Sequence, residues 1–140
     1  MPQKVLVFGD IGIDDIIAII YGSLNDEVEI VGIVADYGNV IRENALRSIY
    51  YLRSIFKNKL NVPIIAGAEL PMTGEIPEPV SEIHGEYGLG PIIPPENGTD
   101  GVSENFFDIV DIIEEYSNEL IIVNIGRLTS LATMFLILVK

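Results

Sequence analysis

Short apolar segments alternate along the chain with longer segments in which apolar residues recur every three or four positions. Four of the short segments are rich in valine and isoleucine and show no polar alternation: 4–9, 29–35, 62–67 and 119–126. Such segments are typical of parallel strands that are covered on both faces. The sequence therefore predicts four buried strands.

The segments between these strands have helical patterns. Residues 41–57 and 103–117 place apolar side chains on one face of a helix. Residues 14–24 and 128–138 are apolar nearly all round, which predicts shorter, buried helices. The resulting order predicts an α/β fold, an open and mostly parallel sheet with right-handed crossovers and helices on both faces.

Residues 69–100 interrupt this alternation. The segment is rich in proline and glycine, yet it carries apolar and aromatic residues such as Tyr87 and Leu89. A connection of this length inside a compact domain is usually functional or disordered, and its apolar content argues against disorder. We interpret residues 1–140 as one domain in which 69–100 form an ordered lid or binding loop; a meandering connection is the alternative.

The amino-acid composition restricts the kinds of partner that this protein is expected to bind. The 140 residues include 21 acidic and 8 basic side chains, giving a net charge of −13, and no cysteine. Nucleic acids and anionic membranes require basic surfaces, so we expect neither as a partner, whereas cations and neutral small molecules suit this charge. No apolar run reaches the ~20 residues that span a bilayer. We expect a cytoplasmic protein without disulfides.

Three aspartates lie close together where the first apolar run ends. In "VFGDIGIDDIIAII" these are Asp10, Asp14 and Asp15. Asp14 or Asp15 could simply cap the following helix or complement its dipole, which explains one or two carboxylates better than three. Asp10 precedes the turn and can face Asp15 across it. Gathered carboxylate oxygens suit a hard cation such as Ca²⁺ or Mg²⁺, although the spacing is not that of an EF-hand.

Further polar residues follow the other strands. Ligands of open parallel sheets bind beyond the carboxyl ends of the strands, and "ADYGNV" places Asp36 and Asn39 at that edge. Asn39 could equally be an ordinary turn residue. The only histidine, His84, lies in the long loop, where it is either incidental or a hydrogen-bond partner for a bound ligand.

Six segments in order resemble the inosine–uridine preferring nucleoside hydrolases. They are "FGDIGIDDIIAI", "EIVGIVADYGNV", "ENALRSIYYL", "VPIIAGAELPM", "HGEYGLG" and "ELIIVNIGRLTSLA". The resemblance covers nearly the whole chain but only about the N-terminal half of the family's domain. It implies an enzyme that cleaves the N-glycosidic bond of ribonucleosides, with a Ca²⁺-bound water as nucleophile.

The resemblance also implies roles for individual residues. Asp10 and Asp15 would be ligands of Ca²⁺, together with the backbone carbonyl of Ile125, and Asp10 would take a proton from the bound water. Asp14 and Asn39 would hold ribose hydroxyls. His84 would lie near the base or over the pocket.

The sequence departs from the family pattern at several positions. Ile11 stands where the family usually has proline, and Ile125 where it usually has threonine. A further aspartate ligand, a histidine and ribose-binding groups belong to the family's second half, which has no counterpart before Lys140. We therefore expect an apparently truncated domain with little or no turnover by itself.

Two other hypotheses about function are alternatives to an active hydrolase. One is a non-catalytic remnant that binds metal or ribose weakly, or whose copies associate into a homo-oligomer through an unfinished sheet. The other is a phosphatase with an aspartate nucleophile after the first strand. That chemistry needs a second aspartate two positions later, where Gly12 stands.

Overall fold

A computed structural model describes residues 1–96 and 101–139. The strands are β1 (Gln3–Gly9), β2 (Val28–Ala35), β3 (Ile64–Ala66), β4 (Val102–Ser103) and β5 (Leu120–Asn124). They form one sheet in the order β4-β3-β2-β1-β5, and each neighbouring pair is parallel. The predicted α/β fold with a parallel sheet is confirmed.

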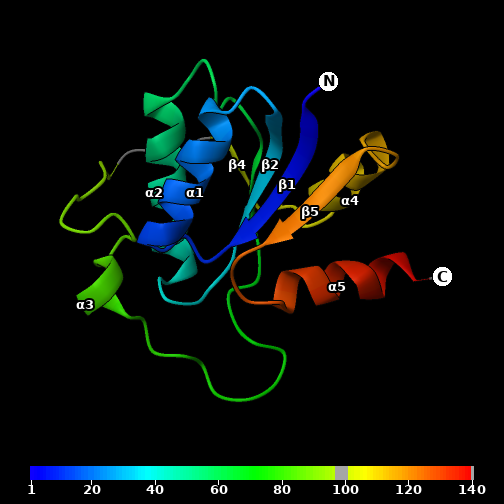
Figure 1. The fold of residues 1–140 in the computed structure, drawn as a ribbon. Helices are drawn as coiled ribbons and strands as arrows, with labels where there is room; N and C mark the ends of the chain where they lie inside the picture. Colours follow the sequence, from blue (N-terminus) through cyan, green and yellow to red (C-terminus); the bar gives the residue numbers. More distant parts are fainter. Residues whose placement is uncertain (97–100, 140) are drawn as a thin grey trace.

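Helices cover the two faces of this sheet (Figure 1). They are α1 (Ile13–Leu24), α2 (Arg42–Ile55), α4 (Asp108–Glu115) and α5 (Thr129–Leu138), while the short helix α3 (Ser81–His84) lies within the long loop. One core lies beneath α1 and α2 and includes Ile33 and Ile49. The other lies beneath α4 and α5 and includes Phe8, Val34 and Ile109. None of the described helices is long and apolar enough to cross a membrane.

The fourth helix begins later than its apolar pattern predicts. Residues 103–117 were expected to be helical, but Val102 and Ser103 pair with β3, and α4 begins at Asp108. Ser103 donates to one carboxylate oxygen of Asp108 at 2.5 Å, and Asn105 donates to the other at 2.7 Å. These short-range bonds favour a turn over a further helical turn before Asp108.

The prediction that all strands are covered on both faces is wrong for β5. Ile121 and Val123 remain 43% and 36% exposed. The two helices expected to be buried are also covered on one side only, as shown by exposed Tyr21 in α1 and Phe135 in α5. An apolar sequence cannot distinguish a covered face from an uncovered one, and no described element packs over these positions.

The described part of the 69–100 loop is tied to α2 by side chains. Arg47 donates to the carbonyl of Pro94 and, at 3.0 Å, to that of Pro95. Ser48 donates to the carbonyl of Tyr87. These bonds and the burial of Leu89 give the segment a definite path. Residues 97–100 of the predicted loop lie outside the described residues, and a role as a lid stays a prediction.

Candidate active site

The carboxyl ends of four strands meet at one rim of the sheet. Asp36 after β2 donates its backbone N–H to the carbonyl of Gly9 at the end of β1, at 2.8 Å. Ile125 after β5 donates its N–H to the carbonyl of Phe8 at 2.9 Å. Ala68 after β3 accepts the N–H of Tyr37 at 2.9 Å. The parallel topology thus brings residues far apart in sequence to one edge, as predicted.

Asp10 and Asp15 form a buried pair of carboxyls at this rim. Their residues are only 5% and 3% exposed. Asp15 accepts the N–H of Gly12 at 3.2 Å across the turn before α1. Burial, followed by a hydrogen bond with Asp10 and the charge of Asp10, raises the pKa of Asp15 to about 7. The ionised form of Asp15 is therefore unfavourable beside Asp10.

Close backbone packing holds Asp10 in place. Gly38 lies so near that a Cβ there would be 2.2 Å from Oδ2 of Asp10. The same carboxylate oxygen accepts the backbone N–H of Asn39 at 2.6 Å. Any side chain at position 38 would therefore have to displace the carboxylate, so the turn after β2 requires glycine at this point.

The turn between Asp10 and α1 is strained at Ile11. Its φ of 53° lies in the left-handed region, which β-branched residues rarely adopt, and its side chain is fully buried. Such a conformation costs on the order of 1–3 kcal/mol and persists only where its surroundings impose it. Here the turn directs both Asp10 and Asp15 toward the same space.

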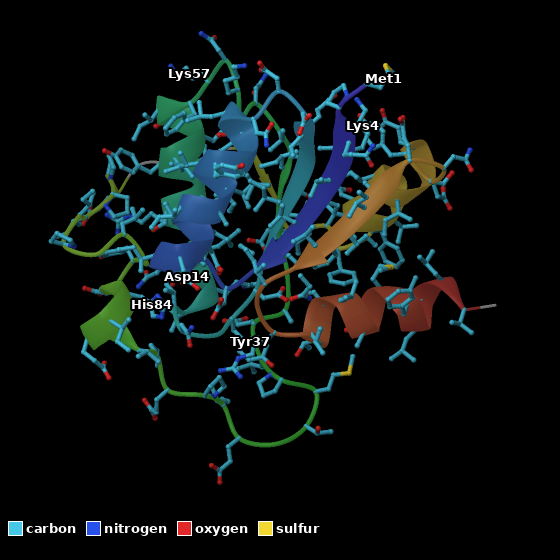
Figure 2. The ribbon with its side chains drawn as sticks, viewed as in Figure 1. Met1, Lys4, Asp14, Tyr37, Lys57 and His84 are labelled. Atoms are coloured by element: carbon cyan, nitrogen blue, oxygen red, sulfur yellow. The ribbon has the colours of Figure 1, made fainter. Side chains whose placement is uncertain are left out.

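Asp14 and His84 meet at the beginning of α1 (Figure 2). The side chain of Asp14 is 77% exposed, and one of its oxygens lies 3.6 Å from Nδ1 of His84. Nδ1 of His84 accepts the N–H of Ile13 at 3.1 Å. The histidine of the long loop is thus fixed over the start of α1, beside an accessible carboxylate.

Asn39 and Ile125 complete the set of predicted residues. Asn39 contacts Asp10 through its backbone N–H, while its carbonyl accepts the N–H of Val80 from the long loop at 2.9 Å. Ile125 is 40% exposed beside Gly9. The structure therefore brings the predicted residues to one rim and links them to the loop.

The pair supplies the two side-chain ligands that the resemblance implies for a cation. Among the described residues, no three histidine or acidic side chains are arranged to hold a metal ion. The predicted ligand set has only two side chains, and its third oxygen is a carbonyl. Within the same residues, neither Asp10 nor Asp15 forms an ion pair with a basic side chain. Carboxylate oxygens are ligands that Ca²⁺ prefers, so these two carboxyls fit part of such a site.

Sequence reasoning missed three residues at the rim. Asp36 was placed at this edge but given no role, and Tyr37 and Ser130 were not considered. Asp36 and Ser130 are both fully buried, and they hydrogen-bond to one another. The only signal in the sequence was an aspartate directly after an apolar strand, which many surface turns share.

An open parallel sheet with paired carboxyls at the ends of its strands is typical of α/β proteins that bind small ligands at that rim. The family model described as "Inosine-uridine preferring nucleoside hydrolase" matches residues 5–137. The chain belongs to this family, as its motifs predicted.

Individual relatives agree with this membership. The chain is 34% identical over 133 residues to uridine nucleosidase 1 of Arabidopsis thaliana, an alignment covering 93% of this chain and 39% of that protein. It is 30% identical to the inosine-uridine preferring nucleoside hydrolase of Crithidia fasciculata, covering 94% and 42%. The solved purine-preferring ribonucleoside hydrolase from Gardnerella vaginalis superposes with a TM-score of 0.84 at 26% identity, covering 97% and 44%. The chain thus spans about two fifths of the length of these relatives.

Proposed function

We propose that this rim is the cation- and ribose-binding part of a site that hydrolyses the N-glycosidic bond of ribonucleosides. The observation that carries the proposal is the buried contact between Asp10 and Asp15, in which burial and mutual repulsion raise the pKa of Asp15 to about 7. A pair of this kind is unfavourable without a bound proton or cation. Its position at the carboxyl ends of parallel strands suits a small ligand.

Asp10, Asp15 and the carbonyl of Ile125 are the proposed calcium ligands. When bound, the ion would offset the two negative charges and make a water molecule more acidic. The backbone N–H groups of Gly12 and Asn39 already hold the two carboxylates in place. The chain therefore supplies fixed oxygen donors that need little rearrangement.

Each remaining residue has a defined task in the proposed reaction. Asp10 accepts a proton from the water that attacks the anomeric carbon of the sugar. As the bond to the base breaks, its electrons leave with the base, and positive charge builds on the ribose beside the carboxylates. Asp14 and Asn39 hold ribose hydroxyls, and His84 faces the base, which must gain a proton as it leaves.

Binding and turnover are separate parts of this proposal. The described residues supply two buried carboxyls and a carbonyl, and the chain spans about two fifths of the length of its hydrolase relatives. We propose that these 140 residues bind the ion and the sugar, and that efficient hydrolysis needs groups from outside them. Release of ribose from inosine or uridine measures the second part directly.

Calorimetry with Ca²⁺ tests the binding part. We expect the chain to bind the ion and both Asp10→Asn and Asp15→Asn to lose at least about tenfold in affinity, because each removes one charged ligand. Asp26→Asn is the matched control, since Asp26 is an exposed aspartate that pairs only with Lys59 among the described residues. Equal heats for the chain and the two site variants would refute the cation site.

A specific observation favours self-association as a second function. An open apolar depression of about 210 Å³ lies between α1 and β5, and it is lined almost entirely by aliphatic side chains such as Val7, Ile19 and Val123. The outer edge of β5 has no partner strand among the described residues. We propose that copies of this chain associate through this edge and the surface beside it.

A further inference from the structure

Asp36 is a buried carboxyl that the proposed reaction does not use. Its residue has no exposed surface. Gly9 pairs with Ala35 in the register of β1 and β2, so Asp36 follows β2 at the level at which Asp10 follows β1. Strand alternation places its side chain on the same face as Val34, which packs beneath α4 and α5. Asp36 therefore lies beside the carboxyl pair, on the side that faces α5.

One oxygen of Asp36 connects three segments of the rim. Its Oδ1 accepts the backbone N–H of Ala68, which begins the path into the long loop, at 3.1 Å. The same oxygen accepts the hydroxyl of Ser130 in the first turn of α5. That hydroxyl oxygen in turn accepts the backbone N–H of Ala68 at 2.8 Å. The ends of β2 and β3 and the start of α5 thus meet in one hydrogen-bonded group formed by Asp36, Ala68 and Ser130.

Neighbouring contacts close the same junction. Tyr37 donates its backbone N–H to the carbonyl of Ala68, and its hydroxyl lies 2.8 Å from Oγ1 of Thr129. Figure 2 shows Tyr37 at this junction, beneath the strands and near the beginning of α5. Gly67 packs so tightly that a Cβ there would lie 1.9 Å from Oδ1 of Asp36. The junction is built around that oxygen.

The second carboxylate oxygen of Asp36 indicates that this position requires a hydrogen-bond acceptor rather than a negative charge. Oδ2 is buried and has no hydrogen-bond partner among the described residues. Burial raises the pKa of Asp36 to about 6, although its hydrogen bonds act in the opposite direction. The negative charge is therefore unfavourable at this position, while the acceptor Oδ1 is used twice. The junction therefore uses Asp36 as a hydrogen-bond acceptor through Oδ1 and does not require its negative charge.

We propose that Asp36 is a positioning residue that clamps the start of the 69–100 loop and the first turn of α5 to the end of β2. Through α5 it fixes the preceding segment, which contains Ile125, and through Ala68 it fixes the path toward His84. The consequence for ligand binding rests on the proposed function, whereas the clamp itself does not.

Hydrogen exchange of the whole chain, measured by mass spectrometry, tests the clamp. We expect Asp36→Ala to speed exchange about tenfold or more in residues 66–70 and 125–132, because two hydrogen bonds to a buried acceptor are lost. Asp36→Asn keeps the acceptor oxygen, so we expect its exchange in both segments to stay within about threefold of the unmodified chain. Ser23→Ala, a buried serine at the far end of α1, is the control for general destabilisation.

The outcomes separate the clamp from other roles. Faster exchange throughout the chain, equal exchange in Asp36→Ala and the unmodified chain, or equal loss in Asp36→Asn and Asp36→Ala would each overturn the proposal. If Asp36→Ala fails to fold, Ser130→Ala removes one partner only and should show the same local pattern at smaller size; no local change there would also overturn it.

Calcium calorimetry on the same variants extends the test to the ligand. We expect Asp36→Ala to weaken Ca²⁺ binding severalfold and Asp36→Asn to restore it. If the unmodified chain binds no Ca²⁺, the proposed function fails, while the exchange pattern still decides the clamp. Unchanged Ca²⁺ affinity in Asp36→Ala would refute the link between the clamp and the site.

Discussion

At the scale of single residues, the site is governed by carboxyl groups held out of water. Asp10, Asp15 and Asp36 are all almost fully buried in a chain with a net charge of −13. Burial disfavours the ionised form, and the charge of Asp10 adds to this effect at both Asp15 and Asp36. This unfavourable free energy is concentrated at the rim for which we propose a bound cation.

The raised pKa values predict how stability depends on pH. Asp15 and Asp36 have pKa values of about 7 and about 6 in the fold, above the ordinary 3.8, so the folded state binds protons more tightly than the unfolded one. Their contribution is full below pH 3.8 and is lost as pH rises through 6 to 7. We expect thermal melting followed by circular dichroism in a chelator to give a lower Tm at pH 8 than at pH 5.

Variants and added Ca²⁺ identify the groups responsible for the fall of Tm with rising pH. Asp15→Asn and Asp36→Asn should each make Tm less dependent on pH, because the amide does not titrate. Asp26→Asn should leave the pH dependence of Tm unchanged. Saturating Ca²⁺ should raise the Tm at pH 8 more than at pH 5, since the ion replaces protons on the pair. A Tm that rises with pH in the chelator would contradict the assignment.

At the scale of elements, α2 is the support of the long loop. The guanidinium of Arg47 bonds the carbonyls of Pro94 and Pro95 and lies 4.7 Å from the ring centre of Tyr87. Asn44 donates to the carbonyl of Glu86 at 3.0 Å. Side chains of α2 therefore hold the part of the loop after α3 by bonding its backbone carbonyls.

Removing that support should release part of the loop. We expect Arg47→Ala to speed limited proteolysis within residues 86–95 about tenfold, because charged hydrogen bonds and the cation–π contact are lost together. Arg47→Lys should be intermediate, since a lysine cannot reproduce the fork of the guanidinium. Arg53→Ala is the control on the same helix, because Arg53 bonds the carbonyl of Val62 instead. Equal cleavage rates in the two alanine variants would contradict this role of Arg47.

At the scale of the whole molecule, apolar side chains remain exposed on β5 and on helices of both faces of the sheet. Ile121 and Val123 of β5, Tyr21 of α1 and Phe135 of α5 are at least 36% exposed. Figure 1 shows β5 at the edge of the sheet, with α1 over the neighbouring strands. Edge strands of this kind usually carry charges that prevent pairing, and β5 carries none.

The unprotected edge predicts concentration-dependent association. We expect sedimentation velocity to show species larger than the monomer, and Val123→Lys to shift the population toward monomer because a buried lysine at such a contact is unfavourable. Ile93→Lys is the control, since Ile93 is an exposed isoleucine of the long loop. A monomer at all concentrations would count against association.

The order of the four longer strands and of the helices between them, and the strand ends that share the rim, can be predicted from the amino-acid pattern, whereas β4 and α3 were not predicted. Valine- and isoleucine-rich runs fix strands, the helical period fixes α2, and parallel strands necessarily bring their following residues to one edge. The contact between Asp10 and Asp15 could therefore be predicted from the sequence, because only four residues and a glycine-containing turn separate them. Local structure and strand topology both follow from the pattern of residues along the chain.

Which surfaces are covered and which oxygens share hydrogen bonds depends on how distant segments pack together. Asp36 and Ser130 are 94 positions apart, and their contact depends on the packing of α5 against the sheet. The exposure of Val123 likewise depends on the absence of a described neighbour over β5. A residue's apolar or acidic character is a property of the sequence, but its burial and its partners are set by elements that arrive from elsewhere in the chain.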